Sequence, residues 1–120
     1  MKKKSIILIG GEGYIGKIVS SFFLKKNFKV HSIDNFIYNQ SFKNQKSNKN
    51  FSLLKINFAN KKIFNHLDKL EHENLIILGS IVGDPITKKY PKITKKINLD
   101  STEKLLKYAL KKKFKRVIFI

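Results

Sequence analysis

Apolar residues are distributed along the chain in two alternating patterns, continuous runs and helical stripes. Short continuous runs bounded by polar residues or glycine are typical of strands buried in a sheet. They predict five strands, at residues 6–9, 30–33, 51–56, 75–78 and 117–120. The fourth run contains no polar residue, which indicates a strand that is buried on both faces.

Between these runs the apolar spacing changes to the three- and four-residue period of amphipathic helices. One helix is predicted to begin at Tyr14, a second to include residues 63–70, and a long third to begin near Pro91 and end in the lysines 111–113. The residues predicted to form the apolar faces are Ile15, Ile18, Val19, Phe22 and Phe23, then Ile63, Phe64, Leu67 and Leu70, and finally Ile93, Ile97, Leu105, Leu106 and Ala109.

Strict alternation of strand and helix predicts an α/β fold, with a parallel sheet of about five strands joined by right-handed crossover helices. Polar stretches at residues 39–50 and 79–85 predict loops. No repeat or linker divides the chain, so a single domain over residues 1–120 is expected. Because the sequence stops within an apolar strand pattern, we expect it to be the N-terminal portion of a longer domain, truncated after the fifth strand.

The composition excludes several classes of protein. The absence of cysteine excludes disulfides and thiolate metal sites. No apolar run approaches the ~20 residues that span a bilayer, and the run after the N-terminal lysines is shorter than the roughly 7–15 residues of a signal peptide. We therefore expect a cytoplasmic protein with no membrane partner.

The formal net charge of +18 suggests a nucleic-acid partner at first sight. All of the 26 basic residues except Arg116 are lysine, however, and they are scattered through every segment. Arginine is the usual residue for contacting base edges, so specific nucleic-acid binding is not expected. Weak, salt-sensitive attraction to polyanions is expected.

Three glycines at a spacing of three, Gly10, Gly13 and Gly16, follow the first predicted strand and open the first predicted helix. In this strand–turn–helix setting a glycine-rich turn holds the pyrophosphate of a dinucleotide. Glycine allows the tight turn, lets main-chain amides approach the phosphates and lets helix and sheet pack closely, while the helix N-terminus adds a positive dipole end. The alternative is a flexible corner without a ligand.

An acidic residue, Asp34, ends the second predicted strand. In a dinucleotide site a carboxylate at this position accepts hydrogen bonds from the adenosine ribose hydroxyls and repels a 2′-phosphate. Asp34 therefore favours NAD over NADP as the cofactor. The alternative role is capping of a turn before Asn35.

The same motifs support a resemblance to a known family. The stretches GGEGYIG and VHSIDNF, followed by LLKINFAN, LIILGSIVGDP and the long segment KINLDSTEKLLKYALKKKFKRVIFI, resemble the extended short-chain dehydrogenase/reductases, in particular the NAD-dependent epimerase/dehydratase group that acts on nucleotide sugars. The resemblance implies a Rossmann-type, doubly wound parallel sheet. It covers essentially the whole chain but only the N-terminal part of such an enzyme.

The resemblance also implies roles for individual residues. Five of them surround the pyrophosphate, and the others follow the cofactor from its adenosine half to its nicotinamide half. The implied set is Gly10, Gly13 and Gly16 in the pyrophosphate turn, the amides of Tyr14 and Ile15 on phosphate, Asp34 and Asn35 on the ribose, Asn57 and Phe58 beside the adenine, Leu78, Gly79 and Ser80 along the middle of the cofactor, and Asn98 near its nicotinamide half.

Four departures from the family pattern affect this implied site. Ile9 replaces the usual Thr before the glycines, Asn57 replaces an Asp, and glycine and serine replace two alanines at residues 79–80. Glu12 stands where a small residue is common. A carboxylate there would oppose pyrophosphate binding unless it pointed to solvent, so its direction matters for the assignment.

Hydride transfer in the family depends on a Ser or Thr beyond the fifth strand and on a Tyr-x-x-x-Lys motif in the next helix. This sequence contains neither, so we assign no catalytic residue and make no claim of catalysis by this chain alone. The segment YALKK, residues 108–112, has the spacing but precedes the fifth strand, and we interpret it as a chance match in a lysine-rich sequence. His31, His66 and His72 are dispersed, and no metal site is predicted.

The leading functional hypothesis is the NAD-binding portion of a nucleotide-sugar epimerase or dehydratase, whose partner in the complete enzyme is a nucleotide-sugar substrate. The first alternative is a dinucleotide-binding module without catalysis, or an inert fragment. A polyanion-binding basic protein is the third hypothesis. The sequence does not determine the sugar, the reaction subtype or the oligomeric state.

Overall fold

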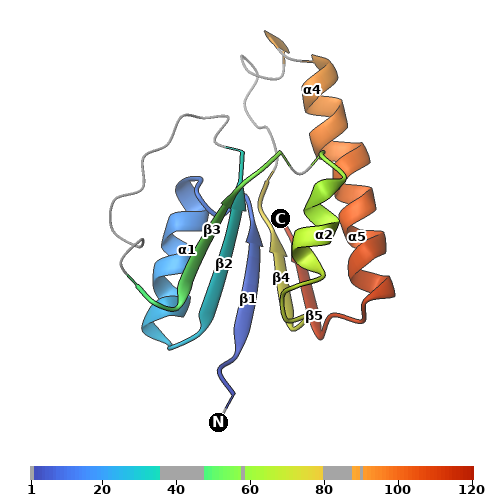
Figure 1. Cartoon of the computed structure of the whole chain (residues 1–120). Coiled ribbons are helices and arrows are strands. Elements are labelled where there is room, and N and C mark those ends of the chain that lie inside the picture. The colour runs from blue at the N-terminus through green and yellow to red at the C-terminus, as the bar shows by residue number, and fades with distance from the viewer. Residues whose placement is uncertain (1, 36–47, 58, 80–87, 90) are drawn as a thin grey trace.

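A computed structural model describes residues 2–35, 48–57, 59–79, 88–89 and 91–120 (Figure 1). Within these residues the chain forms one five-stranded parallel sheet with the strand order β3-β2-β1-β4-β5. The strands are β1 (Ser5–Ile9), β2 (Lys29–Asp34), β3 (Phe51–Lys55), β4 (Asn74–Ile77) and β5 (Arg116–Phe119). The predicted doubly wound α/β sheet is therefore confirmed, and each predicted strand is present to within one residue at either end.

Among the described residues, helices follow β1, β3 and β4, as predicted. They are α1 (Tyr14–Lys25), α2 (Lys62–Leu67), α4 (Pro91–Lys95), the π-helical segment η1 (Lys96–Ser101) and α5 (Thr102–Lys111). The last three follow one another without interruption, so the long helix predicted from Pro91 exists and contains a π-helical segment in its middle. The predicted loop at residues 79–85, apart from Gly79, and most of the loop at residues 39–50 lie outside the described residues.

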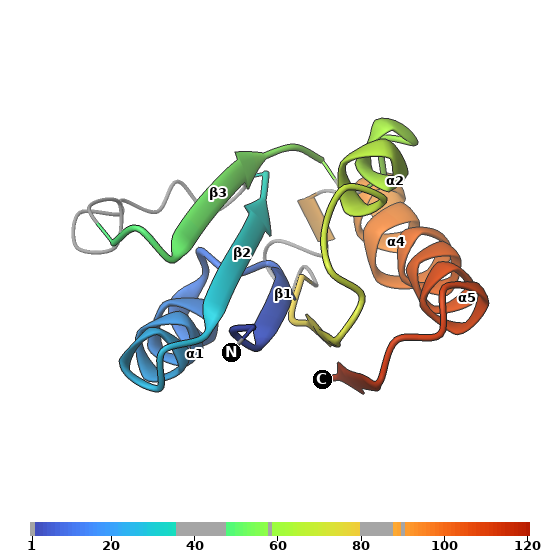
Figure 2. The ribbon, with the colours of Figure 1, turned by 60° about the horizontal axis from the view of Figure 1, so that its bottom comes forward.

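The sheet separates two apolar cores, because alternate residues of each strand point to opposite faces. Helix α1 covers one face, and α2 and α5 cover the other (Figure 2). The core on the α1 side contains Ile6, Leu8, Val30 and Ile76. The core on the other side contains Ile7, Ile9, Ile33, Ile63, Leu67, Leu75, Ile77, Leu105 and Ala109. Residues 75–77 are buried, as their uniformly apolar pattern predicts.

The predicted apolar face of α1 is only partly correct. Val19 and Phe23 pack on the core, but Ile15, Ile18 and Phe22 are each more than half exposed. The buried positions of α1 are instead the small residues Gly16 and Ser20. Apolar residues occupy so much of this helix circumference that periodicity alone does not select the buried stripe, and small residues bring the helix axis closest to the sheet.

The predicted faces of the other helices agree better with the structure. Ile63 and Leu67 of α2 are buried, with Phe64 and Leu70 packed beside them. In α5, Leu105 and Ala109 are buried, whereas Leu106 is 38% exposed, contrary to the prediction. Consecutive helical residues lie about 100° apart around the axis, so only one of two adjacent leucines faces the sheet.

The edge strand β5 pairs with β4 alone among the described strands and is exposed along its whole length. Its apolar side chains are exposed by 39% at Val117, 48% at Ile118 and 51% at Phe119. None of the helices among the described residues combines the length and the apolar character that crossing a membrane requires.

The contrast between two leucines of α5 gives a test of this packing. We expect Leu105→Ala to lower the free energy of unfolding by about 2–5 kcal/mol, because it leaves a cavity between α5 and the sheet. Leu110 is 82% exposed on the same helix, so Leu110→Ala should change that free energy by less than about 0.5 kcal/mol. Urea denaturation followed by far-UV circular dichroism measures both. Equal losses in the two variants would contradict the assigned helix face.

Candidate functional site

The candidate site lies at the carboxyl edge of the sheet, where the strand order reverses. β1 is flanked by β2 on one side and β4 on the other, and the chain passes from β3 at one edge to β4 beyond β1 (Figure 1). In open parallel sheets such a switch point leaves a crevice beyond the strand ends, in which ligands bind. Apart from Asn98, the predicted site residues that the structure describes follow β1, end or follow β2, or follow β3 and β4, so the topology brings them to this one edge.

At two glycines, one in the turn after β1 and one at the start of α1, a side chain would clash with the main chain. Gly10 has φ of +82°, and a Cβ there would lie 2.6 Å from the Cα of Gly79, which follows β4. A Cβ on Gly16 would lie 2.5 Å from the carbonyl oxygen of Gly11, within the turn itself. Because Gly10 has no side chain, the ends of β1 and β4 can meet. Because Gly16 has none, α1 can start directly against the turn.

A side chain is tolerated at Gly13, unlike at Gly10 and Gly16. Among the described residues, the nearest atom to a Cβ on Gly13 would be the carbonyl oxygen of Gly10 at 3.6 Å, an ordinary van der Waals contact, and this residue is the N-cap of α1 without a side-chain cap. The side chains of Tyr14 and Ile15 are exposed, and the first turn contains no acidic residue. The first N–H groups of a helix have no partner within the helix, so this end presents amide donors and the positive end of the dipole. Such an end suits an anion.

Asp34 ends β2 beside the turn and is 6% exposed. Its Oδ2 accepts a hydrogen bond of 3.0 Å from the main-chain N–H of Glu12. The amide of Gly10 donates to the carbonyl oxygen of Ile33 over 2.7 Å. The turn is therefore fastened to the end of β2 by both main-chain and carboxylate acceptors, and Asp34 faces the turn.

The side chain of Glu12 does not point to solvent, the direction that the sequence analysis required for pyrophosphate binding. It is fully buried, and its Oε2 accepts a 2.5 Å hydrogen bond from the hydroxyl of Ser32 on β2. Oε1 is buried without a hydrogen-bond partner in the described part of the chain. Loss of solvation raises the pKa of the Glu12 carboxyl, and the nearby Asp34 charge raises it further, against lowering by Ser32 and Lys17. Sequence reasoning missed this inward anchor, and the only signal for it was a large polar residue within a run of glycines.

Of the remaining predicted residues, Leu78 and Gly79 lie beside the turn after β1, and Asn57 follows β3. Leu78 is half-buried on the α1-side core, and its amide donates to Ile9 over 2.7 Å, which puts Gly79 beside the turn. Asn57 is exposed after β3, and its Oδ1 accepts from the amide of Ala59 over 2.9 Å.

Four more predicted residues remain, and the structure describes only the first of them in full. Asn35 is half-buried directly after β2. Asn98 belongs to η1, but its side chain is not described. Phe58 and Ser80 lie outside the described residues.

Tyr108, the tyrosine of the chance Tyr-x-x-x-Lys match, takes part in a contact between helices. Its hydroxyl donates a 2.5 Å hydrogen bond to Asp68, just after α2, and Lys112 lies 3.5 Å from the same carboxylate oxygen. Burial raises the pKa of the Tyr108 hydroxyl, and the hydrogen bond to Asp68 raises it further. A catalytic base requires the opposite shift. Among the described residues no group of His, Asp and Glu could hold a metal ion.

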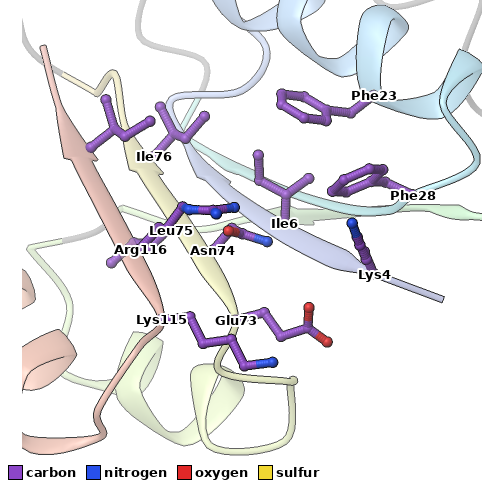
Figure 3. A pocket seen from close by; sticks show the side chains of 11 residues that line it. Lys4, Ile6, Phe23, Phe28, Glu73, Asn74, Leu75, Ile76, Lys115 and Arg116 are labelled. Atoms are coloured by element: carbon purple, nitrogen blue, oxygen red, sulfur yellow. The ribbon is translucent and has the colours of Figure 1, made fainter. Parts of the chain in front are cut away.

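A separate hollow of about 500 Å³ lies at the opposite, amino-terminal edge of β1, β4 and β5 (Figure 3). Its apolar lining includes Ile6 of β1 and the rings of Phe23 and Phe28 on the α1 side. Lys115 and Arg116, both exposed, contribute to its rim. It contains none of the residues predicted for the cofactor, so it is distinct from the candidate site.

Comparisons with known proteins place the chain in one family. Residues 6–120 match the model of the NAD dependent epimerase/dehydratase family. A UDP-N-acetyl-alpha-D-glucosaminuronate decarboxylase from Bacillus cytotoxicus is 29% identical over 117 residues, which cover 98% of this chain and 36% of that protein.

Solved structures share the fold at low sequence identity. Pal from Bacillus thuringiensis has a TM-score of 0.85 at 19% identity, over 96% of this chain and 38% of that one. The Bordetella bronchiseptica enzyme WbmG in complex with NAD has a TM-score of 0.83 at 17% identity, over 98% and 37%. A UDP-glucose 4-epimerase with UDP-glucose from Thermotoga maritima has a TM-score of 0.79 at 22% identity, over 96% and 37%. The chain thus spans about a third of the length of these relatives.

The glycine contacts predict that three substitutions of the same chemical type differ in effect. Gly10→Ala forces a side chain into a positive φ and onto Gly79, and Gly16→Ala forces one onto the turn. Each should lower the free energy of unfolding by about 1–3 kcal/mol or more. Gly13→Ala places its Cβ at an ordinary contact distance of 3.6 Å from the carbonyl oxygen of Gly10 and should remain within about 1 kcal/mol of wild type. Thermal and urea denaturation measure all three, and a Gly13 variant as damaged as the other two would refute the turn geometry.

The raised pKa of Glu12 predicts a pH-dependent penalty on stability. A carboxyl whose pKa is raised by folding stabilises the fold most below its unfolded value of 4.5, and this contribution is lost as the pH rises through the folded pKa. Glu12→Gln removes the titration, so its melting temperature should exceed that of wild type at pH 7, and the difference should shrink as the pH falls toward 4.5. A difference that is constant across this range would contradict burial of an ionisable Glu12.

Proposed function

Because residues 6–120 match its model, the chain belongs to the NAD dependent epimerase/dehydratase family, and we propose that residues 1–120 bind NAD at the carboxyl edge of the sheet. They act as the cofactor-binding portion of an enzyme that converts nucleotide sugars. The observation that carries the proposal is the glycine turn between β1 and α1, fastened to a β2 that ends in a buried carboxylate. Phosphate-binding amides and a ribose-binding carboxylate are thereby neighbours.

The pyrophosphate is proposed to lie over Gly13 at the start of α1. The lack of a side chain at Gly13 lets a phosphate group approach the first amides of α1. The amides of Tyr14 and Ile15 donate to the phosphate oxygens while their side chains remain outside. Gly10 and Gly16 hold the turn in the shape that this approach requires.

The remaining parts of the cofactor are proposed to follow the same edge. Asp34 and Asn35 hold the adenosine ribose, and Asn57 and Phe58 flank the adenine beyond β3. Leu78, Gly79 and Ser80 lie along the middle of the cofactor beyond β4, and Asn98 orders its nicotinamide half. The placement of Gly79 against Gly10 supports this path, because it brings the loop after β4 next to the pyrophosphate turn.

NAD is proposed in preference to NADP on electrostatic grounds. The carboxylate of Asp34 is nearly buried at the position where the ribose 2′-oxygen would be bound, and the Glu12 carboxyl is close enough for the two charges to interact. A 2′-phosphate would add at least one negative charge beside two carboxyl groups in a poorly solvated place. The ribose hydroxyls of NAD instead donate hydrogen bonds to the Asp34 carboxylate.

The activity of the complete protein is proposed from the family and from the relatives that carry UDP-sugar names. The chemistry that bound NAD supplies is reversible acceptance of a hydride from a sugar carbon. The described residues contribute binding and orientation, since Tyr108 serves the contact between α2 and α5. A dinucleotide-binding module without catalysis remains the alternative for this chain alone. Location in the cytoplasm stays a prediction.

Titration of the purified chain with NAD tests the proposal. Asp34→Ala removes the acceptor of charge-assisted hydrogen bonds, which are worth about 1.5–3 kcal/mol each, so NAD affinity should fall about 10- to 150-fold. The matched control is Glu103→Gln, which removes an exposed carboxylate on α5 and should bind NAD as wild type does. NADP should bind wild type at least tenfold more weakly than NAD. Isothermal titration calorimetry measures each affinity, and wild type without measurable NAD binding would overturn the proposal.

A further inference from the structure

Glu12 carries the only side chain among residues 10–13, because the other three residues of this stretch are glycines. The main chain at residue 12 therefore lies between two glycines, which restrict it little. Its amide is nevertheless the donor that contacts Oδ2 of Asp34, over 3.0 Å. The direction of this donor depends on whatever holds residue 12 in place.

The side chain of Glu12 restrains the main chain of residue 12 by bonding to β2. Its Oε2 accepts the 2.5 Å hydrogen bond from Ser32, a residue of β2 that precedes Asp34 by two positions. Residues two apart in a strand point to the same face, so Ser32 and Asp34 lie on the same side of β2. Glu12 thus contacts β2 twice, through its carboxyl at Ser32 and through its amide at Asp34.

Ser32 also limits the position of the turn directly. Its Oγ occupies the place where a side chain on Gly11 would begin, so turn and strand are in close contact at this point. The Glu12 side chain is fully buried and Ser32 is 1% exposed, so solvent does not compete for their hydrogen bond. The restraint on residue 12 is consequently well defined.

Burial of the Glu12 carboxyl lowers the stability of the fold. One oxygen has no hydrogen-bond partner within the described residues, and the charge of Asp34 is nearby. An unsatisfied buried polar group lowers stability, and a side chain that breaks this rule often serves a functional site. The small residue common at this position would avoid both penalties but would leave residue 12 without an anchor.

We propose that Glu12 is a positioning residue for the adenosine ribose. Anchored on Ser32, it holds its own amide on Oδ2 of Asp34 and thereby fixes the carboxylate that accepts the ribose hydroxyls. Glu12 does not contact the cofactor in this arrangement and acts through Asp34. The inference rests on the proposed NAD site and extends it to a residue whose type is unusual at this position.

The test compares ADP with 2′-deoxy-ADP, which share the adenine and the two phosphates but differ in one ribose hydroxyl. Wild type should bind ADP about tenfold more tightly, since one charge-assisted hydrogen bond is worth about 1.5 kcal/mol or more. Glu12→Ala should reduce this ratio to less than about threefold while its affinity for 2′-deoxy-ADP changes little. A purely structural role would weaken both ligands alike and leave the ratio unchanged.

Three further variants complete the experiment. Ser32→Ala removes the hydroxyl that anchors Glu12 and should reduce the ratio of the two affinities as Glu12→Ala does. If Glu12→Ala fails to fold, Ser32→Ala decides the question. Glu12→Gln retains an oxygen that accepts from Ser32 and should restore the wild-type ratio. Asp34→Ala should abolish the discrimination between ADP and 2′-deoxy-ADP, and it sets the lower limit of the affinity ratio.

The outcomes separate this inference from the proposed function. If wild type binds NAD and discriminates between the two diphosphates, but Glu12→Ala and Ser32→Ala keep the full ratio, the inference is overturned and the NAD site stands. If wild type binds neither NAD nor ADP, both are overturned. Loss of the ratio in Glu12→Ala and Ser32→Ala, with recovery in Glu12→Gln, supports the positioning role.

Discussion

The fastening of the turn after β1 to the carboxyl end of β2 is the constraint on which the rest of the site depends. The amide of Gly10 donates to Ile33, and the amide of Glu12 donates to Asp34. These bonds bring the start of α1 beside the end of β2, although a whole helix separates the two in the chain. Amide donors suited to phosphate and a carboxylate suited to a ribose are therefore positioned by a single set of contacts, before any ligand is bound.

The buried polar residues of this region lower the stability of the fold but restrain the geometry of the turn. Glu12 and Asp34 are both buried, and the charge of Asp34 disfavours the charged form of Glu12. An apolar or small residue at position 12 would remove this repulsion, but it would also remove the link to Ser32. The apolar cores on the two faces of the sheet stabilise the fold and offset this local loss of stability.

Short motifs acquire meaning only from their place in the fold. The three-residue glycine spacing lies between β1 and α1, and its contacts require glycine at Gly10 and Gly16. The Tyr-x-x-x-Lys spacing at Tyr108 lies on α5, where the hydroxyl is bound to Asp68 and its pKa is raised. Both patterns match the family at the level of letters, and only the first has the surroundings that its chemistry requires.

The amino-acid pattern alone predicts the order of the strands and helices, the parallel sheet, and the glycines and Asp34 at the ends of its strands. These features could be predicted because apolar period and glycine placement are local properties of the chain. Packing in three dimensions places Ile18 and Phe22 outside while Gly16 is buried, and turns Glu12 inward to Ser32. Those outcomes depend on neighbours that are distant in the chain, as Ser32 is from Glu12 by 20 residues, and no local pattern specifies which distant residue will lie alongside.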